Sequence, residues 1–180
     1  MLADELGDSW RIHEEGLNAR ESAFDSPYKP FLNGLTALPM ALVSQKPLDL
    51  LIIALGTNDL KTHTVRESCL GVERLIRCAQ TIDALYPAGT PVFAKGPKIL
   101  VVSPIAITSE SPDDALCGKY KESLLFPKAM AAICADCGVE MLDAQQFAEP
   151  SPVDGVHMEP KDHRALGLGV VQKVRCMMEE

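Results

Sequence analysis

The stretch 48-LDLLIIALGTND-59 decides the fold of this 180-residue chain. Residues 48–55 are nearly all Leu, Ile or Ala, follow a proline and end at a glycine. A short apolar run without alternating polar positions is typical of a strand that is buried on both faces, as in a parallel sheet. The run therefore predicts a central strand of an α/β fold, with the polar tetrapeptide GTND at its carboxyl end.

Three other segments are expected to be strands. Residues 98–102 are rich in Ile, Leu and Val, and residues 10–14 and 139–142 are shorter and precede a turn or a polar segment. Apolar residues at helical spacing predict four helices, at residues 34–44, 65–85, 119–137 and 160–178. Strands that alternate with helices predict a parallel sheet that is covered by helices on both faces.

Length and composition indicate one globular domain, residues 1–180. Hydrophobic residues make up 47% of the chain and charged residues 23%, far from the composition of disordered chains. The net charge of -8, without a local Lys/Arg cluster, argues against nucleic acid as a partner. No apolar run reaches the roughly 20 residues that span a membrane, and residues 1–10 are too acidic for a signal peptide. We therefore expect a soluble, cytoplasmic protein.

The six cysteines are expected to be free thiols in the core, because most of them lie in apolar, helix-like segments of an unsecreted protein. They are Cys69, Cys78, Cys117, Cys134, Cys137 and Cys176. Cys134 and Cys137 form a CxxC, but no second CxxC or nearby ligand histidine completes a zinc site. We therefore expect no metal at this pair.

The predicted central strand is followed by an amide side chain, Asn58. At the carboxyl end of a strand, such a group can donate a hydrogen bond to an oxyanion. Alternatively, Asn58 and Asp59 only turn the chain or cap the next helix. The tetrapeptide alone does not separate the two interpretations.

A carboxylate and an imidazole lie three residues apart at Asp154 and His157, just before the last predicted helix. If the loop bends, the acid orients the base, and general-base chemistry needs such a pair. The alternative is a solvent-exposed Asp-Gly turn beside an incidental surface histidine. The other histidines, His13, His63 and His163, lack a similarly placed acid.

Together, the GTND tetrapeptide and the Asp-x-x-His loop resemble the third and fifth sequence blocks of the SGNH (GDSL-like) hydrolase family. Residues 14–20 (EEGLNAR) resemble its second block as found in arylesterases and acyltransferases, and residues 32–34 (LNG) extend the similarity, which covers essentially the whole chain. The resemblance implies a three-layer α/β/α sandwich with a central parallel, flavodoxin-like sheet. It also implies hydrolysis of small esters or acyl transfer to alcohols, with neither a metal nor an organic cofactor.

The resemblance further assigns roles to four residues. His157 would be the general base and Asp154 its orienting acid, while the Asn58 side chain and the backbone amide of Ala19 would hold the oxyanion. Many family members have glycine at the position of Ala19. A backbone donor tolerates the alanine if its φ is negative.

The nucleophilic serine of the family belongs to a first block, Gly-Asp-Ser, at the end of the first buried strand. This chain has a Gly-Asp-Ser ending at Ser9, but residues 1–6 are more typical of a helix end. Only six residues separate Ser9 from Gly16, where the family has a long connection and a helix. We therefore expect Ser9 to be a turn residue and the first strand, with the nucleophile, to be absent from this chain.

A sheet without its first strand would expose backbone groups and apolar faces of both neighbouring strands. We therefore expect the chain alone to have low stability. The alternatives are dimerisation through the vacated edge, or a different topology in which Ser9 is the nucleophile. Two functions stay open: an esterase, or a catalytically inactive relative that binds a small ligand or acts through assembly. A nucleotide-binding domain is disfavoured, because no glycine-rich phosphate loop follows a strand.

Overall fold

The computed structural model describes residues 2–26, 29–87, 89–108 and 115–179. Its sheet has three parallel strands in the order β1-β2-β3. They are β1 (Leu51–Ile53), β2 (Ile99–Val102) and β3 (Glu140–Leu142). Each lies inside a range that the sequence predicts as a strand, so these three predictions are confirmed.

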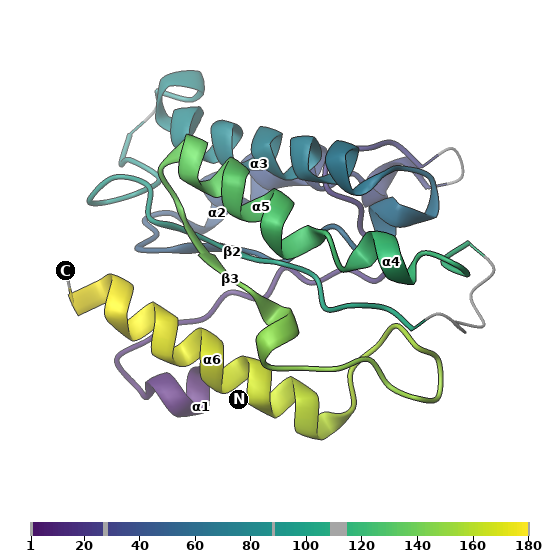
Figure 1. Ribbon diagram of the computed structural model, residues 1–180. Coiled ribbons are helices and arrows are strands. Elements are labelled where there is room, and N and C mark those ends of the chain that lie inside the picture. Colours follow the sequence, from purple (N-terminus) through teal and green to yellow (C-terminus); the bar gives the residue numbers. More distant parts are fainter. Residues whose placement is uncertain (1, 27–28, 88, 109–114, 180) are drawn as a thin grey trace.

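Helices cover both faces of this sheet (Figure 1). One face carries α2 (Gly34–Gln45), α3 (Val65–Leu85) and α5 (Phe126–Cys137), and the other carries α1 (Leu2–Leu6) and α6 (Pro160–Glu179). The side chains of the central strand β2 divide between the two layers. Ile99 and Val101 belong to the apolar cluster of the first face, and Leu100 and Val102 to the cluster of the second. This is the predicted three-layer α/β/α architecture.

Helix α3 begins and ends where the apolar spacing predicts, at Val65 and Leu85. Thr64 caps its first turn: the hydroxyl accepts a hydrogen bond from Glu67 N, and the Glu67 carboxylate accepts one from Thr64 N. The predicted apolar face is buried against the sheet, which explains why the sequence pattern places this helix so well.

The helix predicted at residues 119–137 is interrupted, which the sequence analysis missed. It consists of a short turn, α4 (Tyr120–Ser123), and then α5, with a turn between them. Pro127 has no amide hydrogen to donate to the carbonyl of Ser123, so the helical hydrogen-bond pattern cannot continue from α4 into α5. The Gln145 side chain donates to that carbonyl instead, at 2.9 Å.

The strand predicted at residues 10–14 is not formed, and this prediction is wrong. The segment is irregular, and Trp10 N bonds back to Gly7 O in the turn that follows α1. A strand exists only through hydrogen bonds to a neighbouring strand, and among the described residues this segment has no such neighbour.

All six cysteines are free, as predicted. Cys69, Cys134 and Cys137 are buried, and burial raises the pKa of Cys69 to about 12 and that of Cys134 to about 11. These thiols are therefore protonated and unreactive at neutral pH. The prediction of a core position is wrong for Cys117 and Cys176, which are exposed. Among the described helices, none has the length and apolarity needed to cross a membrane.

Candidate active site

The chain leaves β1 through Gly56, whose φ of 133° is a conformation that side chains rarely adopt. A Cβ here would lie 3.1 Å from Pro104 Cγ and 3.1 Å from Ser68 Oγ. Only glycine therefore lets the loop after β1 pass so close to Pro104 in the loop after β2. Two strand ends are thereby brought together at one edge of the sheet.

Asn58 lies in the loop after β1, where it opens the 3-10 helix Asn58–Lys61, so its backbone does turn the chain, but its side chain caps no helix. Instead, its Nδ2 donates to the backbone carbonyl of Arg20 at 3.2 Å. Helix α3 is capped by Thr64. The capping alternative for Asn58 thus has no support in the geometry, and its amide group lies beside the loop that carries Ala19.

Asp59 is fully buried, and sequence reasoning missed it as a structural element of the site. Its Oδ1 accepts a hydrogen bond from Ser22 N at 2.8 Å, and its Oδ2 accepts from the Ser22 and Ser68 hydroxyls at 2.6 Å each. Burial raises the pKa of Asp59, and these hydrogen bonds oppose the rise. A carboxylate placed directly after an apolar strand is the signal that could have revealed this anchor.

Two glycines let the loop around Ser22 sit close to the helices. A Cβ on Gly34 would meet Ser22 O at 2.8 Å and Glu21 O at 2.9 Å. A Cβ on Gly71, in α3, would meet Ser22 Oγ at 2.1 Å. The contacts that hold the loop thus leave no room for a side chain at Gly34 or at Gly71.

Ala19 adopts a left-handed conformation with φ 62°, so the condition for an unstrained alanine at this position, a negative φ, is not met. It lies in a tight turn closed by the hydrogen bond from Arg20 N to Leu17 O at 3.2 Å. A positive φ at the third turn residue is typical of a type II turn, in which glycine is preferred. Alanine therefore carries backbone strain here, and this explains the preference for glycine at this position in the resembling family.

Asp154 and His157 form the expected pair. His157 Nδ1 lies 2.8 Å from Asp154 Oδ2, while Asp154 Oδ1 accepts from Val156 N and His157 N at 2.9 Å each. The two backbone amides, and then the imidazole, lower the pKa of Asp154 to about 2. The His157 side chain is 76% exposed. An ionised carboxylate thus holds an accessible imidazole in a fixed orientation, as a general base requires, and the catalytic role of the pair stays a prediction.

The loop that carries this pair is fastened to the loop after β2. Thr108 N donates to Gly155 O at 2.8 Å, and Gly155 has a positive φ of 70° that a bend of this kind requires. Pro104, in the same loop after β2, lies so close to Gly56 that a Cβ there would be 3.1 Å from its ring. The loop that carries Asn58 and the loop that carries Asp154 and His157 therefore both lie against this one loop. The structure brings Asn58 next to Arg20 and Asp154 next to His157, both at the carboxyl edge of the sheet.

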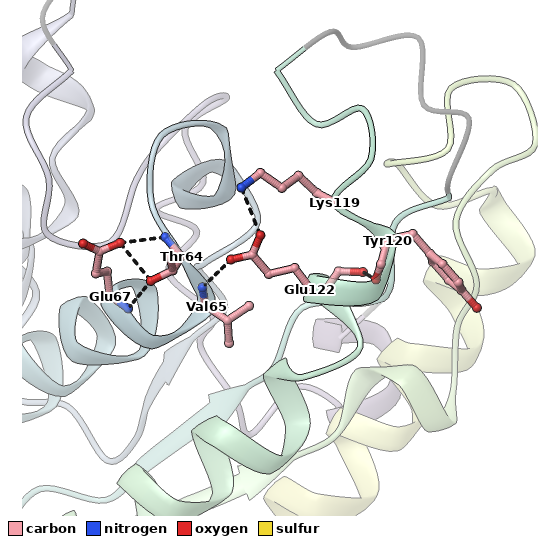
Figure 2. Close-up of polar contacts among 7 residues, drawn as sticks. Thr64, Val65, Glu67, Lys119, Tyr120 and Glu122 are labelled. Atoms are coloured by element: carbon pink, nitrogen blue, oxygen red, sulfur yellow. Dashed lines mark hydrogen bonds and ion pairs between the residues drawn. The ribbon is translucent and has the colours of Figure 1, made fainter.

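Helix α4, which follows the loop after β2, contacts the start of α3 (Figure 2). Glu122, in α4, accepts a hydrogen bond from Val65 N at 3.2 Å and pairs with Lys119 at 2.9 Å. A carboxylate at a helix amino terminus complements the helix dipole. This contact fixes α4 to the segment that directly follows the Asn58 loop.

Ser9 lies in an exposed turn after α1, as predicted. Helix α1 is attached to α6 by the ion pair between Glu5 and Arg164 and by a hydrogen bond from Arg175 to Glu5 O. Met1 itself lies outside the described residues. The helix predicted for residues 1–6 is confirmed, and Ser9 therefore does not follow a strand of the sheet.

No family model and no curated protein matches the chain. Solved structures do match it. Est24, a carbohydrate acetylesterase from Sinorhizobium meliloti, has a TM-score of 0.89 and 34% identity, over 98% of this chain and 83% of that one. A carbohydrate acetylesterase family member from the same organism has a TM-score of 0.89 and 30% identity, over 99% and 85%.

The aryl esterase of M. smegmatis is similar to the same degree. Its TM-score is 0.86 and its identity 32%, over 97% of this chain and 82% of that one. Shared backbone geometry alone would show only the fold, but these neighbours also share about a third of their residues over nearly the full length of this chain. The chain therefore belongs to the esterases of the SGNH (GDSL-like) hydrolase family.

Proposed function

We propose that the protein hydrolyses small carboxylic esters through a serine nucleophile, with His157 as general base and Asp154 as its orienting acid. The observation that carries this proposal is the 2.8 Å contact between Asp154 Oδ2 and His157 Nδ1. It holds the imidazole by one nitrogen and leaves Nε2 to exchange a proton with the nucleophile, as general-base catalysis requires.

In the proposed reaction, the serine Oγ bonds to the ester carbonyl carbon while its proton moves to His157 Nε2. The Asn58 side chain and the Ala19 amide donate hydrogen bonds to the carbonyl oxygen as it becomes negative. The carbon–oxygen bond to the alcohol then breaks, and the alcohol takes the proton from His157, which leaves an acyl-serine. Water, activated by His157, releases the carboxylic acid; an alcohol in place of water gives a new ester.

The substrates we propose are short acyl esters, in particular acetyl esters of sugars and of phenols. Support comes from the solved relatives, which are described as carbohydrate acetylesterases and an aryl esterase. Acyl transfer to an alcohol needs no further residue, because it differs from hydrolysis only in the acceptor.

One observation favours a second function. The only Gly-Asp-Ser of the chain ends at Ser9, in an exposed turn after α1 and not after a strand. Without a nucleophilic serine beside His157 and Asn58, these two residues and Asp154 would form an incomplete site. The second candidate is therefore a catalytically inactive family member that binds a small ligand or acts through assembly.

The two functions are separated by turnover and by covalent labelling. We would measure hydrolysis of p-nitrophenyl acetate and of acetylated xylose, and covalent labelling by a fluorophosphonate, which reacts only with an activated serine. His157→Ala should lower turnover about a hundred- to ten-thousand-fold. The matched control is His163→Ala, an exposed histidine in α6. Absence of both labelling and turnover would reject the esterase proposal in favour of the inactive family member.

A further inference from the structure

The loop that carries the proposed base, residues 150–158 (the His157 loop), is closed at its base. In Figure 1 it is the yellow-green segment that leads into α6. An isolated antiparallel bridge joins Pro150 to Met158. Just before the loop, Glu149 N donates to the carboxylate of Asp162, in the first turn of α6, at 3.4 Å. The loop thus begins and ends beside the start of α6, which fixes its two ends relative to each other.

Ser151, in this loop, is 4% exposed, and each of its polar atoms has a partner within residues 151–159. Its amide donates to His157 O at 2.6 Å, and its carbonyl accepts from Gly155 N at 2.7 Å. Its hydroxyl accepts from Val153 N at 3.1 Å and donates to the carboxylate of Glu159. One buried residue is therefore joined to four others around the loop.

Glu159 directs its carboxylate back to the His157 loop, although it lies next to the start of α6. Its carbonyl accepts from the amides of Asp162 and His163 at 2.9 and 3.0 Å, at the first turn of the helix. An acidic side chain near a helix start is usually stabilised by the free amides of that turn. Here the carboxylate accepts from the Ser151 hydroxyl. The side chain of Glu159 therefore serves the loop.

The His157 imidazole is held by hydrogen bonds and not by packing, because its side chain is 76% exposed. Its Nδ1 lies 2.8 Å from Asp154 Oδ2, and its backbone amide donates to Asp154 Oδ1. Its backbone carbonyl accepts from Ser151 N. The His157 backbone is thus fixed on both sides of its Cα. An exposed ring without packed neighbours keeps one orientation only as long as such hydrogen bonds hold it.

We propose that Ser151, held in place by Glu159, is a positioning residue for His157: it fixes the His157 backbone so that Nδ1 stays on Asp154 and Nε2 stays without a proton before a substrate binds. The role of His157 as a base rests on the proposed function; the positioning of its imidazole does not. Ser151 is not the nucleophile in this assignment, because its hydroxyl is buried and donates to Glu159.

A local turn explains only part of this arrangement. Serine hydroxyls commonly accept from the amide two residues later, and the bond from Val153 N to Ser151 is of this kind. The bond to Glu159 spans eight residues, and such a turn requires neither that bond nor burial of the serine. The two interpretations differ for Glu159→Ala, which leaves the turn intact and removes only the partner of the Ser151 hydroxyl.

The ring ¹⁵N signals of His157 report its positioning directly. At about pH 8.5 histidine is neutral. In a ring held by Asp154 one nitrogen carries the proton and the other does not, so their shifts are far apart; a released ring exchanges the two tautomers, and the shifts converge. His157→Ala identifies the signals by their loss. We expect the separated pattern in the parent chain. Ser151→Ala and Glu159→Ala should lose about half of the separation and exchange the His157 amide hydrogen about tenfold faster.

Two acidic residues provide matched variants. Glu159→Gln keeps an oxygen that can accept from Ser151, so it should retain the separated ring pattern that Glu159→Ala loses. Glu149→Ala removes the same charge from an exposed position just before the loop and should behave as the parent does. Circular dichroism and Tm show that each variant is folded before the spectra are compared. Glu159→Ala keeps Ser151 and its turn, so it tests the proposal even where Ser151→Ala does not fold.

Steady-state kinetics on p-nitrophenyl acetate test the same variants for catalysis. Ser151→Ala and Glu159→Ala should lower kcat about tenfold or more and leave KM nearly unchanged, because a displaced base is felt mainly in the transition state. Glu159→Gln should recover most of the kcat that Glu159→Ala loses.

An unchanged ring pattern in folded Glu159→Ala would overturn the inference even if the Tm falls, since that is the result of a merely structural contact. Equal effects of Glu159→Ala and Glu149→Ala would overturn it as well. The outcome for the esterase is separate. A ring pattern lost as expected, with no turnover in the parent chain, upholds the positioning and rejects the esterase. Turnover in the parent chain with a ring pattern that no variant changes upholds the esterase and rejects the positioning.

Discussion

Ser22 and Asp59, 37 positions apart in the sequence, are joined by two buried hydrogen bonds, from Ser22 N to Oδ1 at 2.8 Å and from Ser22 Oγ to Oδ2 at 2.6 Å. They connect the loop that contains Ala19 to the loop that contains Asn58. Since the Ala19 amide and the Asn58 side chain are the two proposed oxyanion donors, this pair fixes where one donor lies relative to the other.

Asp59→Asn should therefore lower kcat on the order of ten- to a hundred-fold, because displacement of donors by a fraction of an ångström is enough. One amide oxygen cannot accept all three hydrogen bonds, so the free energy of unfolding should also fall by about 1–3 kcal/mol. Steady-state kinetics on p-nitrophenyl acetate and urea unfolding measure the two effects. Asp136→Asn, exposed on α5, is the control. Lost stability with full kcat would make Asp59 purely structural.

Asn58→Ala should lower kcat about a hundred-fold or more and leave KM nearly unchanged, as expected for a donor used mainly in the transition state. Steady-state kinetics on p-nitrophenyl acetate give both constants. A rise in KM alone would assign Asn58 to substrate binding. Because its side chain caps no helix, the Tm should change little.

Asp154 should stay ionised well below the pH at which an ordinary aspartate is protonated. With its pKa lowered from 3.8 to about 2, its hydrogen bonds stabilise the folded loop fully above pH 3.8, and this contribution is lost as the pH falls toward 2. The carboxyl ¹³C shift should therefore be constant between about pH 6 and 4. His157→Ala should raise the midpoint only partly, because both backbone donors remain. An unchanged midpoint near 4 in the parent chain would contradict the geometry.

Ala19→Gly should increase the free energy of unfolding by about 0.5–1 kcal/mol. Relief of the left-handed strain is worth about 1–2 kcal/mol, and the greater freedom of glycine in the unfolded chain offsets part of it. Ala132→Gly, at an exposed position within α5, should instead destabilise by about 0.5–1 kcal/mol. Urea unfolding of both variants checks the opposite signs; a loss in both would show that Ala19 is unstrained.

Ser9→Ala should change neither turnover nor fluorophosphonate labelling. Ser9 lies in a turn attached to α6 through α1, and it does not follow a strand as a nucleophile at the carboxyl edge must. Mass spectrometry of the labelled chain locates the modified residue. A fluorophosphonate on Ser9 would make it the nucleophile and overturn this assignment.

The sequence alone was sufficient wherever structure depends on neighbours along the chain. The apolar run before Gly56 placed β1, and the spacing of apolar residues placed α3 from Val65 to Leu85, because burial of one helix face repeats with the helical period. Asp154 and His157 are three residues apart, so one bend brings them into contact. These elements could be predicted without knowing the rest of the fold.

Tertiary structure decided what depends on distant partners. Residues 10–14 have the composition of a strand, but a strand needs a hydrogen-bonded neighbour, and among the described residues β1 pairs with β2 alone. The link from Ser22 to Asp59 and the positive φ of Ala19 likewise depend on which segments meet in space. Local sequence determined which segments could form strands and helices. Long-range pairing determined which of them did, because hydrogen bonds between strands join residues that are far apart in the sequence and meet only in the tertiary structure.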